Sequence, residues 1–192
     1  GGGAAAASSR PVALAVGEAF HRLFETWDHD DDPRAQLAAQ RRRLEAALDS
    51  SLPPAFQADG RERADALFAR LERGELLARF RSLGPHVLAR ELPVVMPPAA
   101  TPLDGRGHPE PVGAWTGAID LLVRDPESGR PLVIDFKTDR VEGEEALAER
   151  VASYAPQAAV YREAVRQAAA LTGMPAFEYW FLWADRAWPL PG

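Results

Sequence analysis

The chain has 192 residues, of which 46% are hydrophobic and 26% are charged, a composition typical of a globular domain. It contains no cysteine, which excludes disulfides, zinc–thiolate sites and iron–sulfur clusters and fits a reducing compartment such as the cytoplasm. The formal net charge of −6 differs from the basic excess of self-sufficient nucleic-acid binders, and no apolar run is long enough to predict a membrane span.

The first residues of the chain, GGGAAAASSR, have the composition of a linker. We therefore predict a flexible segment over 1–10 and expect the sequence to be a piece of a longer polypeptide. The rest, 11–192, is predicted to form a single domain. Its first part, 11–86, is expected to be mainly helical, and strands are expected in a core over 87–185.

Apolar residues recur at helical spacing in the first part of the chain, and they predict helices over 11–27, 34–49 and 60–83. The last of these segments is expected to form one or two short helices. The loop DHDDDP separates the first two helices, because Pro33 cannot continue a helix.

Alternating and apolar runs in the second part predict strands over 87–96, 113–125, 131–139 and 176–185. We expect the first three strands to form an antiparallel meander and the fourth to be buried on both faces. A long helix is predicted over 144–171, with Pro156 as a bend or break. The expected fold class is α/β, with helices packed on a small mixed sheet in the order β-β-β-α-β.

Two carboxylates and one ammonium group are expected to meet on this sheet. Asp120 lies late in the second predicted strand, and Asp135 and Lys137 lie two residues apart in the third, on one face of it. In an antiparallel pair, Asp120 can lie opposite or diagonal to Asp135. Lys137 is the one lysine among 22 Lys and Arg residues, so its residue type is informative.

Burying two adjacent carboxylates is costly unless a positive charge lies between them, and a divalent cation is the simplest such charge. Aspartate oxygens suit Mg²⁺ or Mn²⁺, and such a centre could hydrolyse a phosphodiester. Lys137 could stabilise the transition state as a compact charge, or orient and help to deprotonate the water, whereas Arg is never a base. The alternative for Asp135 and Lys137 alone is a core strand that ends in solvated charges.

Four short motifs share the order of a known family: GEAFH (17–21), GAID (117–120), VIDFKT (133–138) and QAAVY (157–161). Together they resemble the RecB/AddA-type branch of the PD-(D/E)XK nuclease superfamily, over residues 17–184. The resemblance implies a restriction-endonuclease-like αβββαβ core and a divalent-metal-dependent DNA nuclease. It also implies a place at the C-terminus of an SF1 helicase-nuclease that processes double-strand breaks.

The resemblance also implies roles for individual residues. The metal ligands would be His21, Asp120, Asp135 and a backbone carbonyl, that of Ile134 or Phe136; Lys137 would be the catalytic lysine; and Gln157 and Tyr161, with Tyr154 on the same helix face, would bind the substrate strand. Glu91 matches a Glu of the branch and is expected near the site, as a support of the ligands. For His21 and Tyr161, packing at the edge of the core is the alternative.

The expected partners are DNA, as a single strand unwound by a helicase, the parent helicase domains and, in a larger complex, a partner subunit, with no membrane. A catalytically inactive domain that binds DNA or supports a complex is the alternative, and so is a stand-alone endonuclease. Inactive relatives usually lose the Asp or the Lys, whereas Asp120, Asp135 and Lys137 are all present here. The acidic net charge suggests that the helicase portion delivers the strand.

Overall fold

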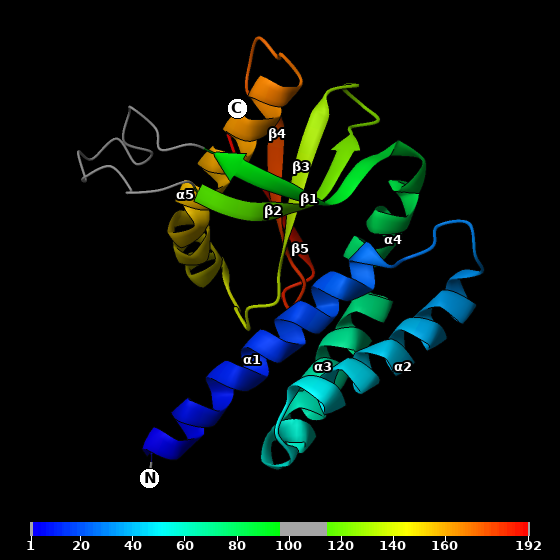
Figure 1. Ribbon diagram of the computed structural model, residues 1–192, viewed down its shortest axis with the longest axis vertical. Helices are drawn as coiled ribbons and strands as arrows, with labels where there is room; N and C mark the ends of the chain where they lie inside the picture. Colours follow the sequence, from blue (N-terminus) through cyan, green and yellow to red (C-terminus); the bar gives the residue numbers. More distant parts are fainter. Residues whose placement is uncertain (1, 97–114, 192) are drawn as a thin grey trace. The chain divides into compact units, whose positions relative to one another are not determined.

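The computed structural model describes residues 2–96 and 115–191 (Figure 1). The chain divides into two compact units. The helical unit comprises Gly1–Gly84, Phe136–Arg140 and Phe181–Arg186, and the sheet unit comprises Pro85–Asp135, Val141–Trp180 and Ala187–Gly192. No helix among the described residues is both long enough and apolar enough to span a lipid bilayer.

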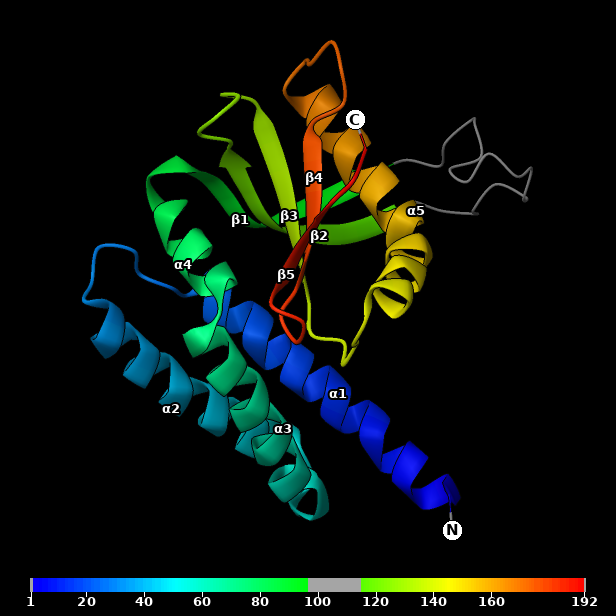
Figure 2. The same cartoon turned by 180° about the vertical axis from the view of Figure 1, so that it is seen from behind.

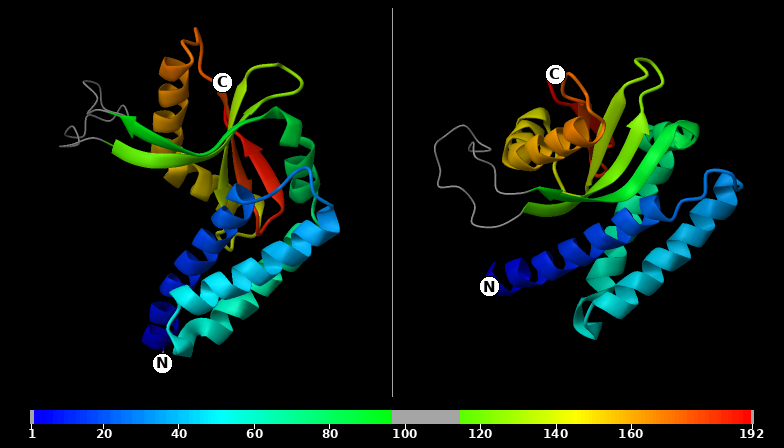
Figure 3. Two further views of the ribbon diagram at one scale, coloured as in Figure 1. Left: turned by 45° about the vertical axis from the view of Figure 1, so that its right-hand side comes forward. Right: turned by 45° about the horizontal axis from the view of Figure 1, so that its top comes forward.

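The helical unit contains four helices: α1 (Gly2–Glu25), α2 (Pro33–Ser51), α3 (Pro54–Arg73) and α4 (Glu75–Ser82). The first three lie side by side (Figures 1 and 3). The predicted apolar stripes face their shared core, as Phe20, Leu48 and Leu67 show by their complete burial. Helix α1 includes residues for which we predict a linker. Several of these residues are alanines, and alanine is the residue type with the highest helix propensity.

Aromatic rings close the core of the helical unit. Phe24 of α1 stacks on Phe136 with ring centroids 4.1 Å apart, and it meets the ring of Phe80 edge-on at 4.8 Å. Trp27 contacts Phe80 edge-on as well. Since aromatic pairs in these geometries contribute about 0.5–1.5 kcal/mol beyond burial, they hold the segment that follows Asp135 against α1.

The start of α4 is capped from a distant part of the sequence. The carboxylate of Asp185 accepts hydrogen bonds from the backbone N–H groups of Glu75 (2.7 Å) and Leu76 (3.1 Å). A Cβ on Gly74 would clash with the Asp185 carboxylate, so a larger residue before this cap would displace the capping group. The cap ties segment 181–186 to the helical unit.

The sheet has five strands in the order β1-β2-β3-β4-β5 (Figure 2). The turn η1 (Gly84–His86) leads into it, and its elements are β1 (Val87–Met96), β2 (Trp115–Arg124), β3 (Pro131–Lys137), α5 (Glu144–Ala168), β4 (Ala176–Phe181) and β5 (Arg186–Pro189). The antiparallel pairing of β1 with β2 and of β2 with β3 confirms the predicted meander. Residues 113 and 114 of the predicted second strand lie outside the described residues.

The end of the chain differs from the sequence prediction. We predict one strand over 176–185, whereas β4 ends at Phe181 and a second, short strand, β5, follows as an edge of the sheet. Pro189 is compatible with β5 because proline is tolerated on edge strands. The prediction that the fourth strand is buried on both faces is confirmed, since Tyr179 and Trp180 point to opposite faces and are both fully buried.

Helix α5 lies against one face of the sheet (Figure 3). It passes through Pro156 without ending, although proline cannot donate the backbone hydrogen bond of that position. Of the two alternatives predicted at Pro156, the break does not occur and the bend stays a prediction, and the helix presents Tyr154, Gln157 and Tyr161 from one continuous element. The fold as a whole is the predicted α/β class, a mixed five-stranded sheet flanked by helices and preceded by a helical region.

Candidate active site

The register of the sheet places two aspartates opposite each other. Strands β2 and β3 pair Leu121 with Ile134, and continuing this register by one residue brings Asp120 opposite Asp135. Opposite residues of an antiparallel pair project from the same face, with Cβ atoms about 4.5–5.5 Å apart. The sequence left the opposite and diagonal arrangements open, and continuation of the register favours the opposite one.

A third carboxylate extends the pair into a row. Strand β1 pairs Arg90 with Leu121, so the next residue, Glu91, faces Asp120. One carboxylate oxygen of Glu91 lies within 4.8 Å of one from Asp120. Glu91 has a backbone φ of +44°, a left-handed conformation that is strained for this residue type inside a strand and that occurs preferentially at functional sites.

We refer to Glu91, Asp120 and Asp135 as the carboxylate row. Asp120 is 7% exposed and Asp135 is 2% exposed, while Glu91 is partly exposed. Like charges at this separation and burial disfavour one another strongly, unless a cation lies among them. Carboxylate oxygens are the ligands preferred by Mg²⁺ and Mn²⁺, so the row has the donor set of a divalent-cation site.

Tyr161 of α5 lies over the carboxylate row. Its phenol oxygen accepts a hydrogen bond from the side-chain amide of Gln157 at 3.1 Å. Burial raises the pKa of Tyr161 to about 12, and the negative charges of Asp135 and Asp120 also raise it, against the lowering effect of hydrogen bonds from Gln157 and the Ala118 backbone. The phenol therefore stays protonated at neutral pH and keeps an O–H that can donate.

Gly117, the glycine of GAID, makes room for this phenol. A Cβ on Gly117 would lie 2.9 Å from the Tyr161 hydroxyl oxygen and 2.8 Å from the ring of Trp115. Trp115 in turn meets the ring of Tyr161 edge-on, with centroids 5.4 Å apart. The glycine and the tyrosine of two motifs distant in sequence thus lie against each other, and Trp115 is a neighbour of the site that the sequence did not indicate.

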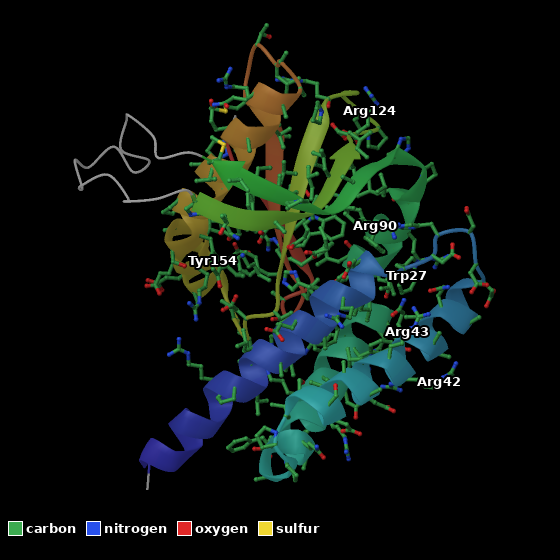
Figure 4. The ribbon with its side chains drawn as sticks, viewed as in Figure 1. Trp27, Arg42, Arg43, Arg90, Arg124 and Tyr154 are labelled. Atoms are coloured by element: carbon green, nitrogen blue, oxygen red, sulfur yellow. The ribbon has the colours of Figure 1, made fainter. Side chains whose placement is uncertain are left out.

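Tyr154 lies on α5 as expected (Figure 4), and it packs on the sheet through Tyr179. Its ring is tilted over the ring of Tyr179 at 5.8 Å, and its backbone carbonyl accepts a hydrogen bond from the Tyr179 hydroxyl at 2.7 Å. Burial, followed by the charge of Asp135, raises the pKa of Tyr179 as well. Tyr154 therefore has a packing role, and its role toward a substrate stays a prediction.

The remaining predicted residues belong to the helical unit. Strand β3 runs on from Asp135 into this unit as Phe136 and the partly exposed Lys137. The ring of His21, on α1, meets the ring of Phe136 edge-on, with centroids 6.3 Å apart. This contact explains part of the packing of His21 at the edge of the core, and its role as a metal ligand stays a prediction, as does that of the Phe136 or Ile134 carbonyl.

The motifs GEAFH and VIDFKT pack on each other inside the helical unit. A Cβ on Gly17 would lie 3.2 Å from the Thr138 hydroxyl oxygen, closer than most Cβ contacts, so the glycine of the first motif faces the threonine of the second. The carbonyl of Lys137 accepts a hydrogen bond from the backbone N–H of Leu182 at 2.9 Å. The backbone around Lys137 is therefore held from both sides.

A signal for the third carboxylate exists in the sequence but is weak. Glu91 stands in an alternating strand, where its polarity alone does not distinguish a solvent-facing residue from a site residue. Only the register of β1 with β2 places its carboxylate beside that of Asp120. For Trp115 the sequence carries no signal, because an aromatic residue at the start of a strand is common.

The chain resembles known proteins at the level of a family. No curated protein matches it. Residues 2–186 match the PD-(D/E)XK nuclease superfamily, and this match covers both units and every residue of the carboxylate row. The chain therefore belongs to the PD-(D/E)XK nuclease superfamily.

Proposed function

We propose that this chain is a divalent-metal-dependent deoxyribonuclease that hydrolyses phosphodiester bonds with Mg²⁺ or Mn²⁺. The observation that carries the proposal is the carboxylate row, since two of its three members are at most 7% exposed and lie on neighbouring strands, next to the pair Leu121 and Ile134. A purely structural role does not account for adjacent buried carboxylates, because neutral side chains would fill the same space without the electrostatic penalty.

The metal would be held by Asp120 and Asp135, with Glu91 beside them and His21 as a nitrogen ligand from α1. A bound divalent ion supplies positive charge that stabilises the negative charge developing on the phosphoryl oxygens. The residues of the chain have to position the strand, align a water molecule with the scissile phosphorus and compensate charge while one P–O ester bond breaks.

Two side chains act on the substrate directly in this proposal. The Tyr161 hydroxyl, which is protonated at neutral pH, donates a hydrogen bond to a phosphate oxygen, and Gln157 orients it. Lys137 follows Asp135 by two residues and so projects from the same face of β3. Its ammonium group places a compact positive charge at the phosphate or orients the attacking water, which a forked guanidinium does less well.

We further propose that the domain is the C-terminal nuclease part of an SF1 helicase-nuclease of the RecB/AddA type, acting in the cytoplasm on double-strand breaks. The motifs GEAFH and QAAVY support this branch, together with the contact that joins Tyr161 to Gly117. The net charge of −6 supports delivery of a single strand by other domains.

The first test is cleavage of an end-labelled single-stranded DNA with Mg²⁺, with Mn²⁺ and with EDTA. We expect cutting only with a metal, and Lys137→Ala should slow it by about 10²–10⁴-fold. Arg124→Ala is the matched control, because Arg124 is an exposed cation at the end of the neighbouring strand (Figure 4), and its removal should leave the rate unchanged.

Retention of the full rate by Lys137→Ala would contradict the mechanism. Absence of cutting by the parent chain, with calorimetry showing that Mn²⁺ binds and that Asp120→Asn abolishes this binding, would support a domain that depends on its helicase. Absence of both cutting and metal binding would favour the catalytically inactive alternative.

A further inference from the structure

The helical unit contains a second polar feature, whose residues are distinct from those of the carboxylate row. A pocket of about 410 Å³ opens between α3 and the segments that follow β3 and β4. We call it the arginine pocket, and its polar and aromatic lining consists of Asp59, Glu62, Arg63, Arg70, Arg140 and Trp183.

Trp183 organises the cations of this pocket. The guanidinium carbon of Arg70 lies 4.6 Å from the centroid of the Trp183 ring, and that of Arg140 lies 5.0 Å from it. Trp183 is itself only 4% exposed, so its ring is not free to stack on a base. Its contribution is to hold two guanidinium groups in place, which reduces the entropy cost when they bind a ligand.

Arg63 is the third cation and the most enclosed one. Its Nε atom is buried, and no residue of the described chain accepts a hydrogen bond from it. Burial lowers the pKa of Arg63, and the like charge of Arg140 lowers it further, against the opposing effect of Asp139. An anion in the pocket would relieve the repulsion between the guanidinium groups of Arg63 and Arg140.

The position of the pocket along the chain relates it to the proposed active site. Arg140 follows Lys137 by three residues, which spans at most about 10–11 Å of extended chain. On the other wall, Trp183 directly follows Leu182, whose N–H is bonded to the Lys137 carbonyl. The pocket walls are therefore attached to the backbone of the proposed catalytic lysine from two directions.

We infer that the arginine pocket binds a phosphate group of the single-stranded DNA on which the site acts, one that is not cleaved. Guanidinium groups suit this ligand because they bind phosphate oxygens in pairs. The carboxylates of Asp59 and Glu62 are exposed, so solvent screens their repulsion of the strand. This inference rests on the proposed function, because the nuclease supplies the reason for a DNA strand to be present.

The test measures binding without catalysis. Anisotropy of a labelled oligodeoxynucleotide in EDTA, titrated over a range of salt concentrations, compares the parent chain with Arg63→Gln/Arg140→Gln. We expect affinity to fall about tenfold or more, and the slope of log affinity against log salt to flatten by about 0.7 for each phosphate that the variant no longer neutralises. Arg42→Gln/Arg43→Gln on α2 (Figure 4) removes the same charge from exposed positions and is the control.

Further variants distinguish phosphate binding in the arginine pocket from a dependence on net charge alone. Arg63→Lys/Arg140→Lys keeps the charge and should still weaken binding, because lysine does not bind a phosphate through paired N–H groups. Glu62→Gln should strengthen binding slightly. Equal effects of the pocket pair and of the α2 pair would overturn the inference, since they would show dependence on net charge alone.

Two more results distinguish a failure of the pocket from a failure of the nuclease. Inorganic phosphate that raises the melting temperature of the parent chain but not of the pocket variant, without any binding of the oligonucleotide, would overturn the assignment to a DNA strand. Metal-dependent cleavage in the parent chain with unaltered binding by the pocket variants would overturn the pocket and leave the nuclease intact. Loss of binding in those variants, in a chain that neither cleaves DNA nor binds a metal, would support the pocket and contradict the nuclease.

Discussion

Both units bury polar side chains, but of different kinds. Among the described residues, the helical unit buries the amides Gln36 and Gln40, whereas the sheet unit buries the carboxylates Asp120 and Asp135. Gln40 donates to the Thr26 carbonyl and accepts from the Thr26 hydroxyl, so both ends of its amide are satisfied within its own unit.

The difference separates a structural use of buried polarity from a functional one. A neutral amide with hydrogen-bond partners can be buried at little net cost and holds a loop in place. Facing carboxylates are destabilising until a cation arrives, so the fold tolerates them only where binding compensates. At the same degree of burial, the amides of the helical unit therefore have a structural role, whereas we propose a functional role for the carboxylates of the sheet unit.

The largest effect is expected from Asp135→Asn. Cleavage should fall at least about 1000-fold, because a neutral amide is a poor metal ligand and the transition state loses charge compensation. The free energy of unfolding, measured by urea titration in EDTA, should stay the same or rise, because the repulsion from Asp120 is removed. A marked loss of stability in EDTA would show that the aspartate pair is structural and would break the comparison.

Gln40→Glu is the converse substitution in the helical unit, because it replaces a neutral amide by a carboxylate. It places a charge at a site that is 1% exposed and removes the donor to the Thr26 carbonyl, so the free energy of unfolding should fall by about 3 kcal/mol. Cleavage per folded molecule should not change. Gln40→Met, which fills a similar volume without charge, is the control and should destabilise less. Equal stability of the Glu and Met variants at neutral pH would contradict the burial of the side chain at position 40.

Asp185→Ala tests a charged residue that serves structure alone. It removes the acceptor of two backbone N–H groups at the start of α4, and this should lower the free energy of unfolding by about 1–2 kcal/mol. Asp185→Asn keeps an acceptor and tolerates the local φ of +49°, so it should cost less. The two variants are compared by thermal unfolding, and a change in cleavage rate per folded molecule would argue against a purely structural role.

The smallest expected effect is a change in the free energy of unfolding that is confined to high pH. Because the pKa of Tyr161 is raised from 10.0 to about 12, its protonated form contributes stability that is complete below pH 10 and is lost as the pH rises toward 12. Tyr161→Phe has no such proton, so its unfolding free energy should vary less over this range. Urea titrations below pH 10 and near pH 12 measure the difference, and identical pH profiles would place the phenol in solvent.

The sequence predicted much of the fold because its local patterns were unambiguous. Alternation in β1 and apolar runs in β3 and β4 predicted strands, and the short turn between β2 and β3 agrees with their antiparallel pairing. At Pro156 it left a bend and a break open, and the helix continues there because the packing of α5 outweighs one missing hydrogen bond. It failed at β5, which is too short to carry a periodic signal.

The residues of the candidate site also fall into two groups, those that the sequence predicted and those that only the fold brings together. Asp120, Asp135 and Lys137 could be selected from residue type and spacing, since period 2 fixes the face of a strand on which each side chain lies. Tyr161 and Gln157 could be grouped from helical spacing, but their position over the carboxylates depends on how α5 packs on the sheet.

By itself, the sequence determined the order of elements as far as β4, the two aspartates and the single lysine, because these depend on local periodicity and residue chemistry. Only the tertiary structure decided that Glu91 completes the carboxylate row, that Gly117 makes room for Tyr161 and that Trp183 gathers arginines from distant segments. Each of these contacts joins residues far apart in the chain, and strand register and helix packing, which bring them together, are set by the whole fold rather than by any local pattern.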